Sequence, residues 1–250
     1  MKDTAIEFRQ VSKQFKGAGK PAVSDVSLTI REGEFITILG SSGCGKTTLL
    51  KMVNRLYEPD SGEILLFGKP IAKENPMELR RKIGYVPQKA LLFKGTIMEN
   101  IRFGDDSASD ERVKEAAAIA QSTDFIEDKP DGFDSSISQG GSNVSGGQRQ
   151  RLAIARAIVR KPEIYVFDDS FSALDFKTDS ALRQALSKET GNATVVIVAQ
   201  RVSTIMNADR IIVMDEGKVM GIGTHRELLN TCGTYQEIVR SQLSEEEMSA

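Results

Sequence analysis

Residues 34–50 read EFITILGSSGCGKTTLL and combine an apolar run, a glycine-rich turn and a helical pattern. A continuous apolar run over residues 34–40 predicts a buried strand that stops at a glycine-rich turn, and the helical pattern TTLLKMVNRL follows from Thr47. The turn, GSSGCGKT at residues 40–47, fits G-x-x-x-x-G-K-[ST] in full. Its place between a strand and a helix is the context that a phosphate-binding loop (P-loop) requires. We therefore predict a nucleotide phosphate site here.

Each part of the P-loop has its own predicted task. The glycines let backbone N–H groups surround phosphate oxygens, and the following helix N-terminus adds partial positive charge. Lys46 adds a full charge, Thr47 can ligate Mg²⁺, and Thr48 can bond an α-phosphate oxygen. Cys44 has either a lowered thiol pKa or simply a side chain small enough to fit. The predicted ATP contacts here are Ser41, Ser42, Gly43, Cys44, Gly45, Lys46, Thr47 and Thr48.

The organisation of the chain places the P-loop in an α/β domain. Strand and helix patterns alternate before residue 90 and again after Pro162, which predicts a mainly parallel sheet flanked by helices. Helical patterns dominate residues 91–161, so this segment is predicted to be an inserted helical subdomain. Residues 1–90 and 162–250 would then form the two parts of one core.

Composition excludes several classes of protein. A net charge of −2 with 27% charged residues leaves no electrostatic footprint for nucleic acid. Cys44 and Cys232 are far apart and have no metal-ligand spacing, which suits a reducing compartment. No apolar run approaches the roughly 20 residues that a membrane helix needs. We expect a soluble chain that reaches a membrane only through a partner.

A second acidic motif, VFDDSFSALD, occupies residues 166–175. An apolar strand that ends in Asp168 is typical of the carboxylate that holds Mg²⁺ in P-loop NTPases. Asp169 is where a water-orienting acid is expected, but it is shorter than Glu by one C–C bond, about 1.5 Å. An error of about 1 Å in a reacting group can cost on the order of 100-fold, so Asp169 would position water poorly. Helix capping by Asp168 and Asp169 is the alternative.

The stretch VSGGQRQRLAIARAI, residues 144–158, adds a third ordered motif. With the P-loop upstream and VFDDSFSALD downstream, the chain resembles the ATP-binding subunit of ABC transporters over essentially its whole length. The resemblance implies a P-loop NTPase core with an N-terminal antiparallel β part, ATP and Mg²⁺ as cofactors, and two domains meeting head to tail. The residues implied to contact the γ-phosphate of ATP on the opposite subunit are Ser145, Gly146, Gly147 and Gln148.

Three further roles come from this resemblance. Phe15 would stack on adenine, although a lone aromatic could equally belong to the core. Gln88 would touch Mg²⁺ together with Thr47 and Asp168, and would couple to the membrane domain. Asp175 would lie at the dimer interface, or would only cap a helix. The implied partners are a second ABC ATPase domain, identical or different, and membrane-spanning domains on another chain or removed. The implied location is cytoplasmic, at the inner face of the cell membrane.

A second position departs from the family pattern and, like Asp169, would handle the attacking water less well. Where the family has a histidine near the γ-phosphate, this chain has Gln200, which cannot carry a proton. The one histidine, His225, is expected outside the ATP site at a helix start. The predicted catalytic set is therefore Asp169, Gln200, Lys46 and Gln88. The pattern resembles the degenerate subunit of heterodimeric ABC exporters and predicts slow ATP hydrolysis.

Other functions stay open at this point. The first third resembles ATPases of osmoprotectant importers, whereas the sequence from about Tyr85 onward resembles exporters, so a spliced or engineered chimera without a natural membrane partner is one alternative. An ATP-gated dimerisation module with negligible hydrolysis is another. A chromosome-maintenance ATPase is disfavoured, because no long heptad insertion separates the P-loop from the motif at residues 144–158.

Overall fold

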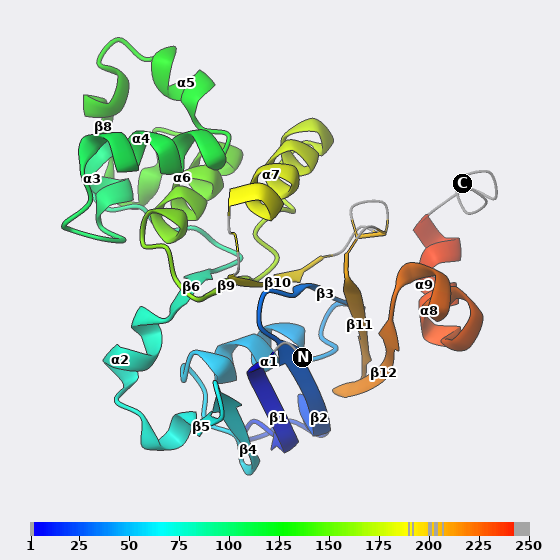
Figure 1. Cartoon of the computed structure of the whole chain (residues 1–250). Coiled ribbons are helices and arrows are strands. Elements are labelled where there is room, and N and C mark those ends of the chain that lie inside the picture. Colours follow the sequence, from blue (N-terminus) through cyan, green and yellow to red (C-terminus); the bar gives the residue numbers. More distant parts are fainter. Residues whose placement is uncertain are drawn as a thin grey trace. The chain divides into compact units, whose positions relative to one another are not determined.

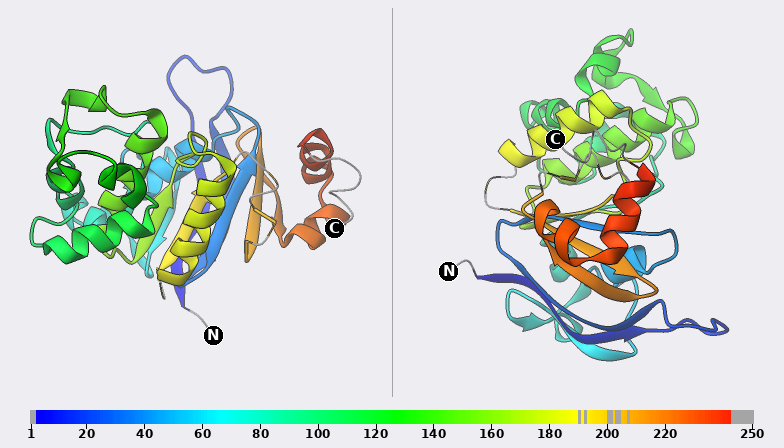
Figure 2. Two further views of the ribbon diagram at one scale, coloured as in Figure 1. Left: turned by 90° about the horizontal axis from the view of Figure 1, so that it is seen from above. Right: turned by 90° about the vertical axis from the view of Figure 1, so that its right-hand side faces the viewer.

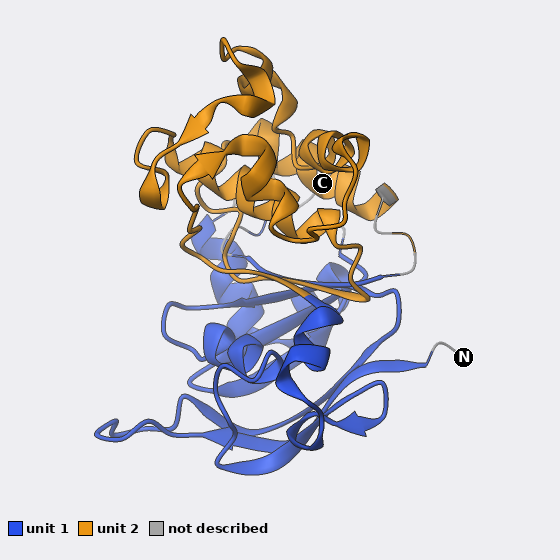
Figure 3. Ribbon diagram, turned by 90° about the vertical axis from the view of Figure 1, so that its left-hand side faces the viewer, with its two compact units in different colours: residues 1–83, 192–250 blue, residues 84–191 orange. Residues whose placement is uncertain are grey.

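The computed structural model describes residues 3–189, 191, 193–199, 202, 205, 206 and 208–242. The chain forms two compact units, residues 1–83 with 192–250 and residues 84–191 (Figure 3). The P-loop belongs to the first unit. The acidic motif and residues 145–148, here called the signature segment, belong to the second. The predicted helical subdomain, residues 91–161, falls within the second unit.

The first unit begins with an antiparallel sheet in the order β2-β1-β4-β5 (Figure 1). Phe8 of β1 lies opposite both Leu28 of β2 and Ile64 of β4, which fixes the register on both sides. This sheet confirms the predicted antiparallel part at the N-terminus. Its strands are β1 (Thr4–Lys13), β2 (Val23–Arg31), β4 (Ser61–Leu66) and β5 (Lys69–Pro70), followed by η1 (Ile71–Lys73) and α2 (Pro76–Arg81).

A parallel sheet carries the P-loop in the same unit. Strand β3 (Phe35–Gly40) lies between β10 (Thr194–Val198) and β11 (Arg210–Asp215) and runs parallel to both. Strand β12 (Lys218–Gly223) pairs antiparallel with β11. Every residue of β10 and the four central residues of β3 and β11 are buried, which explains their nearly continuous apolar sequences.

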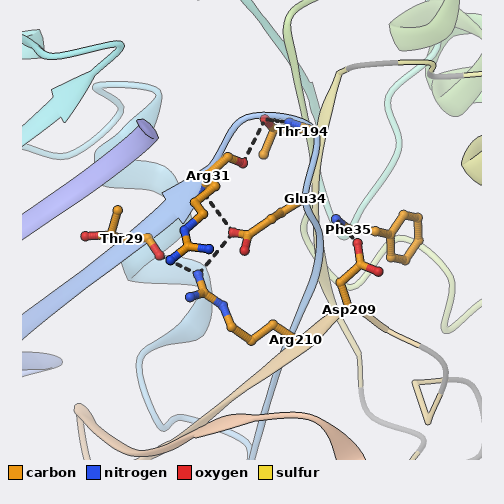
Figure 4. A network of polar contacts seen from close by, with 8 residues as sticks. Thr29, Arg31, Glu34, Phe35, Thr194, Asp209 and Arg210 are labelled. Carbon is orange, nitrogen blue, oxygen red and sulfur yellow. Dashed lines mark hydrogen bonds and ion pairs between the residues drawn. The ribbon is translucent and has the colours of Figure 1, made fainter. Parts of the chain in front are cut away.

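A polar network holds the start of β3, at the end opposite the P-loop (Figure 4). The Glu34 carboxylate accepts the backbone N–H of Arg31 at 2.7 Å and the Arg210 guanidinium at 3.1 Å. Arg210 also donates to the carbonyl oxygen of Thr29, and Asp209 accepts the N–H of Phe35 at 3.0 Å. These contacts connect β2, β3 and β11, so the first residues of the strand that leads into the P-loop are held in place.

Three helices complete the described part of the first unit: α1 (Lys46–Val53), α8 (His225–Thr231) and α9 (Gly233–Gln242). Helix α1 begins inside the P-loop, at Lys46. Helices α8 and α9 lie beside β11 and β12 (Figure 2), because Tyr235 and Val239 of α9 share a buried cluster with Leu39 of β3 and Val213 of β11. The cluster therefore anchors α9 to the strand that precedes the P-loop.

The second unit combines two neighbouring strands with a group of helices. Strands β6 (Ile83–Val86) and β9 (Ile164–Phe167) are adjacent, and all four residues of β9 are buried. Gly104 lets the end of α3 approach α6 closely, since a Cβ there would lie 2.0 Å from the carbonyl oxygen of Arg156. The other elements are β7 (Gly95–Thr96), α3 (Ile97–Arg102), α4 (Asp110–Ile119), α5 (Thr123–Glu127), η2 (Gly132–Asp134), β8 (Ser136–Ile137), η3 (Gln139–Gly141), α6 (Gly146–Val159) and α7 (Phe176–Glu189).

Within the described residues, none of the helices combines the length and the apolar character that crossing a bilayer requires.

Candidate nucleotide-binding site

The P-loop has the backbone form that its glycines predict. Gly45 precedes α1 with a φ of 103°, and a Cβ at this position would lie 2.1 Å from the carbonyl oxygen of Ala22. Only glycine satisfies both the positive φ and the close approach. Ser41, Ser42 and Gly43 are exposed, so the loop opens to solvent at the start of α1. A loop of this form presents backbone N–H groups and a helix N-terminus to an anion.

Lys46 is held over the P-loop itself. Its ammonium group donates to the carbonyl oxygens of Gly40 and Ser41, both at 2.7 Å, and lies 3.3 Å from Sγ of the buried Cys44. Only 9% of Lys46 is exposed. The loop thus concentrates a full positive charge where the backbone form suits phosphate, and the residues fit a nucleotide polyphosphate.

A cavity of about 310 Å³ adjoins the P-loop and is lined partly by α9. Two side chains of its lining form hydrogen bonds: Ser41 donates to Asp215 at 3.2 Å, and Gln242 of α9 accepts the backbone N–H of Val202 at 2.9 Å. No motif in the sequence indicated that α9 reaches the P-loop, where the apolar cluster that it shares with Leu39 holds it. The lining residues are Leu39, Gly40, Ser41, Ser42, Lys46, Ile238, Ser241 and Gln242.

Phe15, the predicted adenine-stacking residue, is not a core residue. It is 37% exposed, and its ring meets the edge of Tyr57 with a centroid distance of 5.1 Å. The ammonium of Lys13 lies 5.8 Å from the Phe15 ring centroid. The exposed aromatic face suits stacking with a planar base, whereas the alternative core assignment does not fit this exposure.

Asp168 and Asp169, here called the acid pair, follow β9 directly and are almost fully buried, with 1% and 6% exposure. The amide of Gln88 donates to Oδ2 of Asp169 at 2.7 Å, so the second unit brings these two predicted site residues together. The φ of Asp169 is +52°, in the left-handed region that costs a side-chain-bearing residue energy. Helix capping does not explain the acid pair, because the next helix, α7, begins only at Phe176.

Tyr85 is a contact of the acid pair that motif reasoning missed. Its hydroxyl donates to Oδ2 of Asp168 at 2.9 Å. The backbone N–H of Asp168 and the hydroxyl of Ser170 both donate to the carbonyl oxygen of Val86, at 2.9 and 2.8 Å. The alternation of the strand IGYV was the available signal, since it predicts that the side chains of Tyr85 and Val86 point to opposite faces.

The donor chemistry around the acid pair fits magnesium. Mg²⁺ prefers oxygen ligands and is usually held by one or two carboxylates together with substrate phosphates. Asp168 offers a buried carboxylate and Gln88 an amide oxygen within the same unit. No group of three or more His, Cys, Asp or Glu side chains among the described residues could hold a metal alone. This set suits a metal that arrives with a nucleotide.

The signature segment, residues 145–148, opens the 14-residue helix α6. Ser145 is the N-cap: its Oγ accepts the N–H of Gln148 at 3.2 Å, while Oε1 of Gln148 accepts the N–H of Ser145 at 3.0 Å. A Cβ on Gly147 would lie 3.2 Å from the carbonyl oxygen of Ala173, so the segment packs closely against the chain that precedes Asp175. The N-terminus of α6 is therefore held in a fixed conformation and is available to an anion.

Asp175 caps α7, as one of its two interpretations predicted. Its carboxylate accepts the N–H of Thr178 at 2.9 Å and the hydroxyl of Thr178 at 2.7 Å. These hydrogen bonds hold the pKa of Asp175 below its usual value. The interface role does not conflict with the cap, because Asp175 is exposed in the chain described.

Gln200, the other departure from the family pattern, lies outside the described residues. His225 is the first residue of α8, with Thr224 as the N-cap, which confirms its expected place at a helix start. Its Nδ1 is hydrogen-bonded to the hydroxyl of the buried Tyr235 at 2.6 Å. Burial lowers the pKa of His225, and burial raises the pKa of Tyr235 to about 12.

Comparison with known proteins identifies the family. Residues 23–172 match the family model described as ABC transporter. The chain is 44% identical over 241 residues to an uncharacterized ABC transporter ATP-binding protein, YfiB, of Bacillus subtilis, and 40% identical over 241 residues to an ATP-dependent lipid A-core flippase of Hahella chejuensis. Each match covers 96% of this chain, which spans 42% and 41% of the length of these relatives.

A solved structure agrees with these relatives. The fold matches a bacterial Atm1-family ABC exporter with ATP bound, with a TM-score of 0.92 and 35% sequence identity. The match covers 97% of this chain and 42% of the exporter chain. The chain therefore belongs to the ABC transporter family, as an ATP-binding domain homologous to those of ABC exporters.

Proposed function

We propose that this chain is the ATP-binding subunit of an ABC exporter and that it hydrolyses ATP weakly. The observation that carries the proposal is the P-loop, in which Gly45 fixes the backbone and Lys46 is held 2.7 Å from two loop carbonyls. Phe15 would stack on adenine, and residues 41–48 would surround the phosphates. The relationship to exporters, including a lipid A-core flippase, supports transport out of the cell as the process served.

ATP would also bring two such domains together. The signature segment of one domain would close over the γ-phosphate held by the other, since its helix N-terminus favours an anion. Asp175 would lie near this interface. The partner would be a second ABC ATPase domain, identical or different, and the pair would act together with membrane-spanning domains. Assembled in this way, the chain would sit at the inner face of the cell membrane.

Thr47, Gln88 and Asp168 would hold Mg²⁺, which when bound neutralises charge on the phosphate oxygens. Lys46 would stabilise the negative charge that develops on the transferred phosphoryl group, and Asp169 would orient the attacking water. The short side chain of Asp169, already engaged by Gln88 at 2.7 Å, supports slow hydrolysis. Gln200 can hydrogen-bond the water but cannot accept its proton.

The same residues permit a second function, an ATP-gated dimerisation module with negligible hydrolysis. The two functions predict equal nucleotide binding and differ in turnover. An engineered chimera would also bind ATP but would lack a natural membrane partner.

One experiment separates weak hydrolysis from the gated module. The purified chain is mixed with Mg-ATP, and its mass by light scattering is followed in parallel with phosphate release. We expect the mass to rise from 27.4 kDa toward twice that value with slow phosphate release. Dimers without release would favour the gated module, and brisk release that Lys46→Ala abolishes would contradict weak hydrolysis. Failure of the wild-type chain to bind ATP would overturn the proposal altogether.

A further inference from the structure

Tyr85 has a role that neither the motifs nor the family match assigns. The residue lies in β6, and its hydroxyl donates to Oδ2 of Asp168 at 2.9 Å. Asp168 is 1% exposed, so this contact lies in a region from which water is largely excluded. A hydrogen bond from a neutral hydroxyl to a buried carboxylate is a strong, charge-assisted contact.

Hydrogen bonds of the neighbouring backbone hold Tyr85 in place beside Asp168. The carbonyl oxygen of Val86 accepts two donors from the acidic motif, the N–H of Asp168 at 2.9 Å and the hydroxyl of the buried Ser170 at 2.8 Å. The next residue, Pro87, accepts the side-chain amide of the buried Gln150 of α6 at 3.1 Å. The segment that carries Tyr85 is therefore tied both to the end of β9 and to the signature helix.

A carboxylate with one oxygen held cannot rotate without breaking that bond. With Oδ2 facing Tyr85, the plane of the Asp168 carboxylate is set before any cation arrives. Groups that hydrogen-bond a metal-ligating carboxylate orient it, and their loss typically costs about 10- to 100-fold in metal affinity.

We propose that Tyr85 is a positioning residue for the magnesium site: it orients Asp168 and thereby sets the affinity for the divalent cation that accompanies ATP. The inference rests on the proposed function, in which Asp168 holds Mg²⁺. Tyr85 acts through Asp168 and leaves nucleotide contacts unaltered, so its effect falls on the metal and not on the base or the phosphates.

The test compares Tyr85→Phe with the wild-type chain by electron paramagnetic resonance titration of Mn²⁺ at saturating ATP, and by ATP binding in EDTA. We expect Mn²⁺ affinity to fall by about tenfold with metal-free ATP affinity unchanged within twofold. Tyr235→Phe is the matched control, because it removes a hydroxyl that is bonded to His225, and it should leave Mn²⁺ affinity unchanged. Unchanged Mn²⁺ affinity in Tyr85→Phe, even with a lower melting temperature, would reduce Tyr85 to a structural role and overturn the proposal.

A second measurement needs no folded variant at position 85. The chain has four tyrosines, so labelling with ¹³C at Cζ gives four signals that Tyr57→Phe, Tyr165→Phe and Tyr235→Phe assign by elimination. Adding Mg²⁺ to the ATP-bound wild-type chain should move the Tyr85 signal more than the other three, and a stationary Tyr85 signal would contradict the inference. If the wild-type chain binds ATP in EDTA but no Mn²⁺, Asp168 is not a metal ligand and both proposals about magnesium fail. If it binds no ATP at all, the proposed function fails at the P-loop.

Discussion

The P-loop and the acid pair are held in different ways, although both follow buried strands. The P-loop depends on backbone: Gly45 at a φ of 103° and two carbonyls that receive Lys46 define it. The acid pair depends on side chains, because Tyr85 holds Asp168 and Gln88 holds Asp169. A site built from backbone keeps its geometry when neighbouring side chains vary. A site built from carboxylates changes with the length of one of them, so under the proposed function ATP binding would persist while hydrolysis slows.

The largest effect should come from adding one methyl group to the P-loop. Gly45→Ala would place a Cβ 2.1 Å from the carbonyl oxygen of Ala22 at a φ that alanine disfavours, so we expect a loss of at least about 3 kcal/mol in the free energy of unfolding. Gly43→Ala is the control, because its φ is also positive, at +81°, but nothing lies within 4 Å of the added atom. Equal losses in the two variants, measured by urea denaturation, would mean that the close approach does not define the loop.

The second test removes the charge and leaves the backbone. Lys46→Ala should weaken ATP binding by about 100-fold, since hydrogen bonds to charged groups contribute about 1.5–3 kcal/mol and the ammonium would serve more than one phosphate oxygen. The readout is the ATP-dependent rise in melting temperature. Lys20→Ala, which breaks an exposed ion pair with Glu216, is the control. A Lys46→Ala chain with the full wild-type shift would refute the phosphate assignment.

The third test lengthens the acid at position 169 and introduces the histidine of the family pattern at position 200. The double variant Asp169→Glu, Gln200→His should raise the rate of phosphate release by at least about tenfold, because the two groups that the proposed function assigns to the attacking water would then suit that role better. ATP affinity should stay the same, since the P-loop is untouched. An unchanged rate would mean that closure of the dimer, and not water positioning, limits turnover.

The smallest effect concerns the one histidine in the chain. Burial, and secondarily the charge of Arg226, lowers the pKa of His225, so below about pH 6.5 the unfolded chain binds more protons than the folded chain. Stability should therefore fall as the pH drops through this range, and His225→Gln should reduce that dependence in thermal melts at pH 5 to 8. Phosphate release should not change, and a loss of turnover in His225→Gln would place this histidine in the catalytic machinery after all.

Sequence reasoning succeeded where a residue type is required by the local backbone conformation. The P-loop, β3 and the opening of α6 at Ser145 all follow from glycines, apolar runs and capping residues that act locally. It failed where distant segments meet. The contact of Tyr85 with Asp168 spans 83 positions, and the approach of α9 to the P-loop depends on packing around Leu39. Asp175 left two interpretations open because a helix cap and an interface residue require the same short acid.

The reciprocal cap at the start of α6 gives Ser145 two functions, stabilising the helix and contacting an anion. The oxygen of the Ser145 hydroxyl accepts the Gln148 N–H, so the hydroxyl hydrogen is the part that a neighbouring anion can receive. Alanine at this position would remove helix nucleation and anion contact together, and its defects could not be apportioned. Aspartate, itself a good cap, would preserve the entry of the helix while repelling a phosphate electrostatically. Comparing Ser145→Ala with Ser145→Asp therefore separates the contribution of the serine to helix stability from its contribution to anion binding.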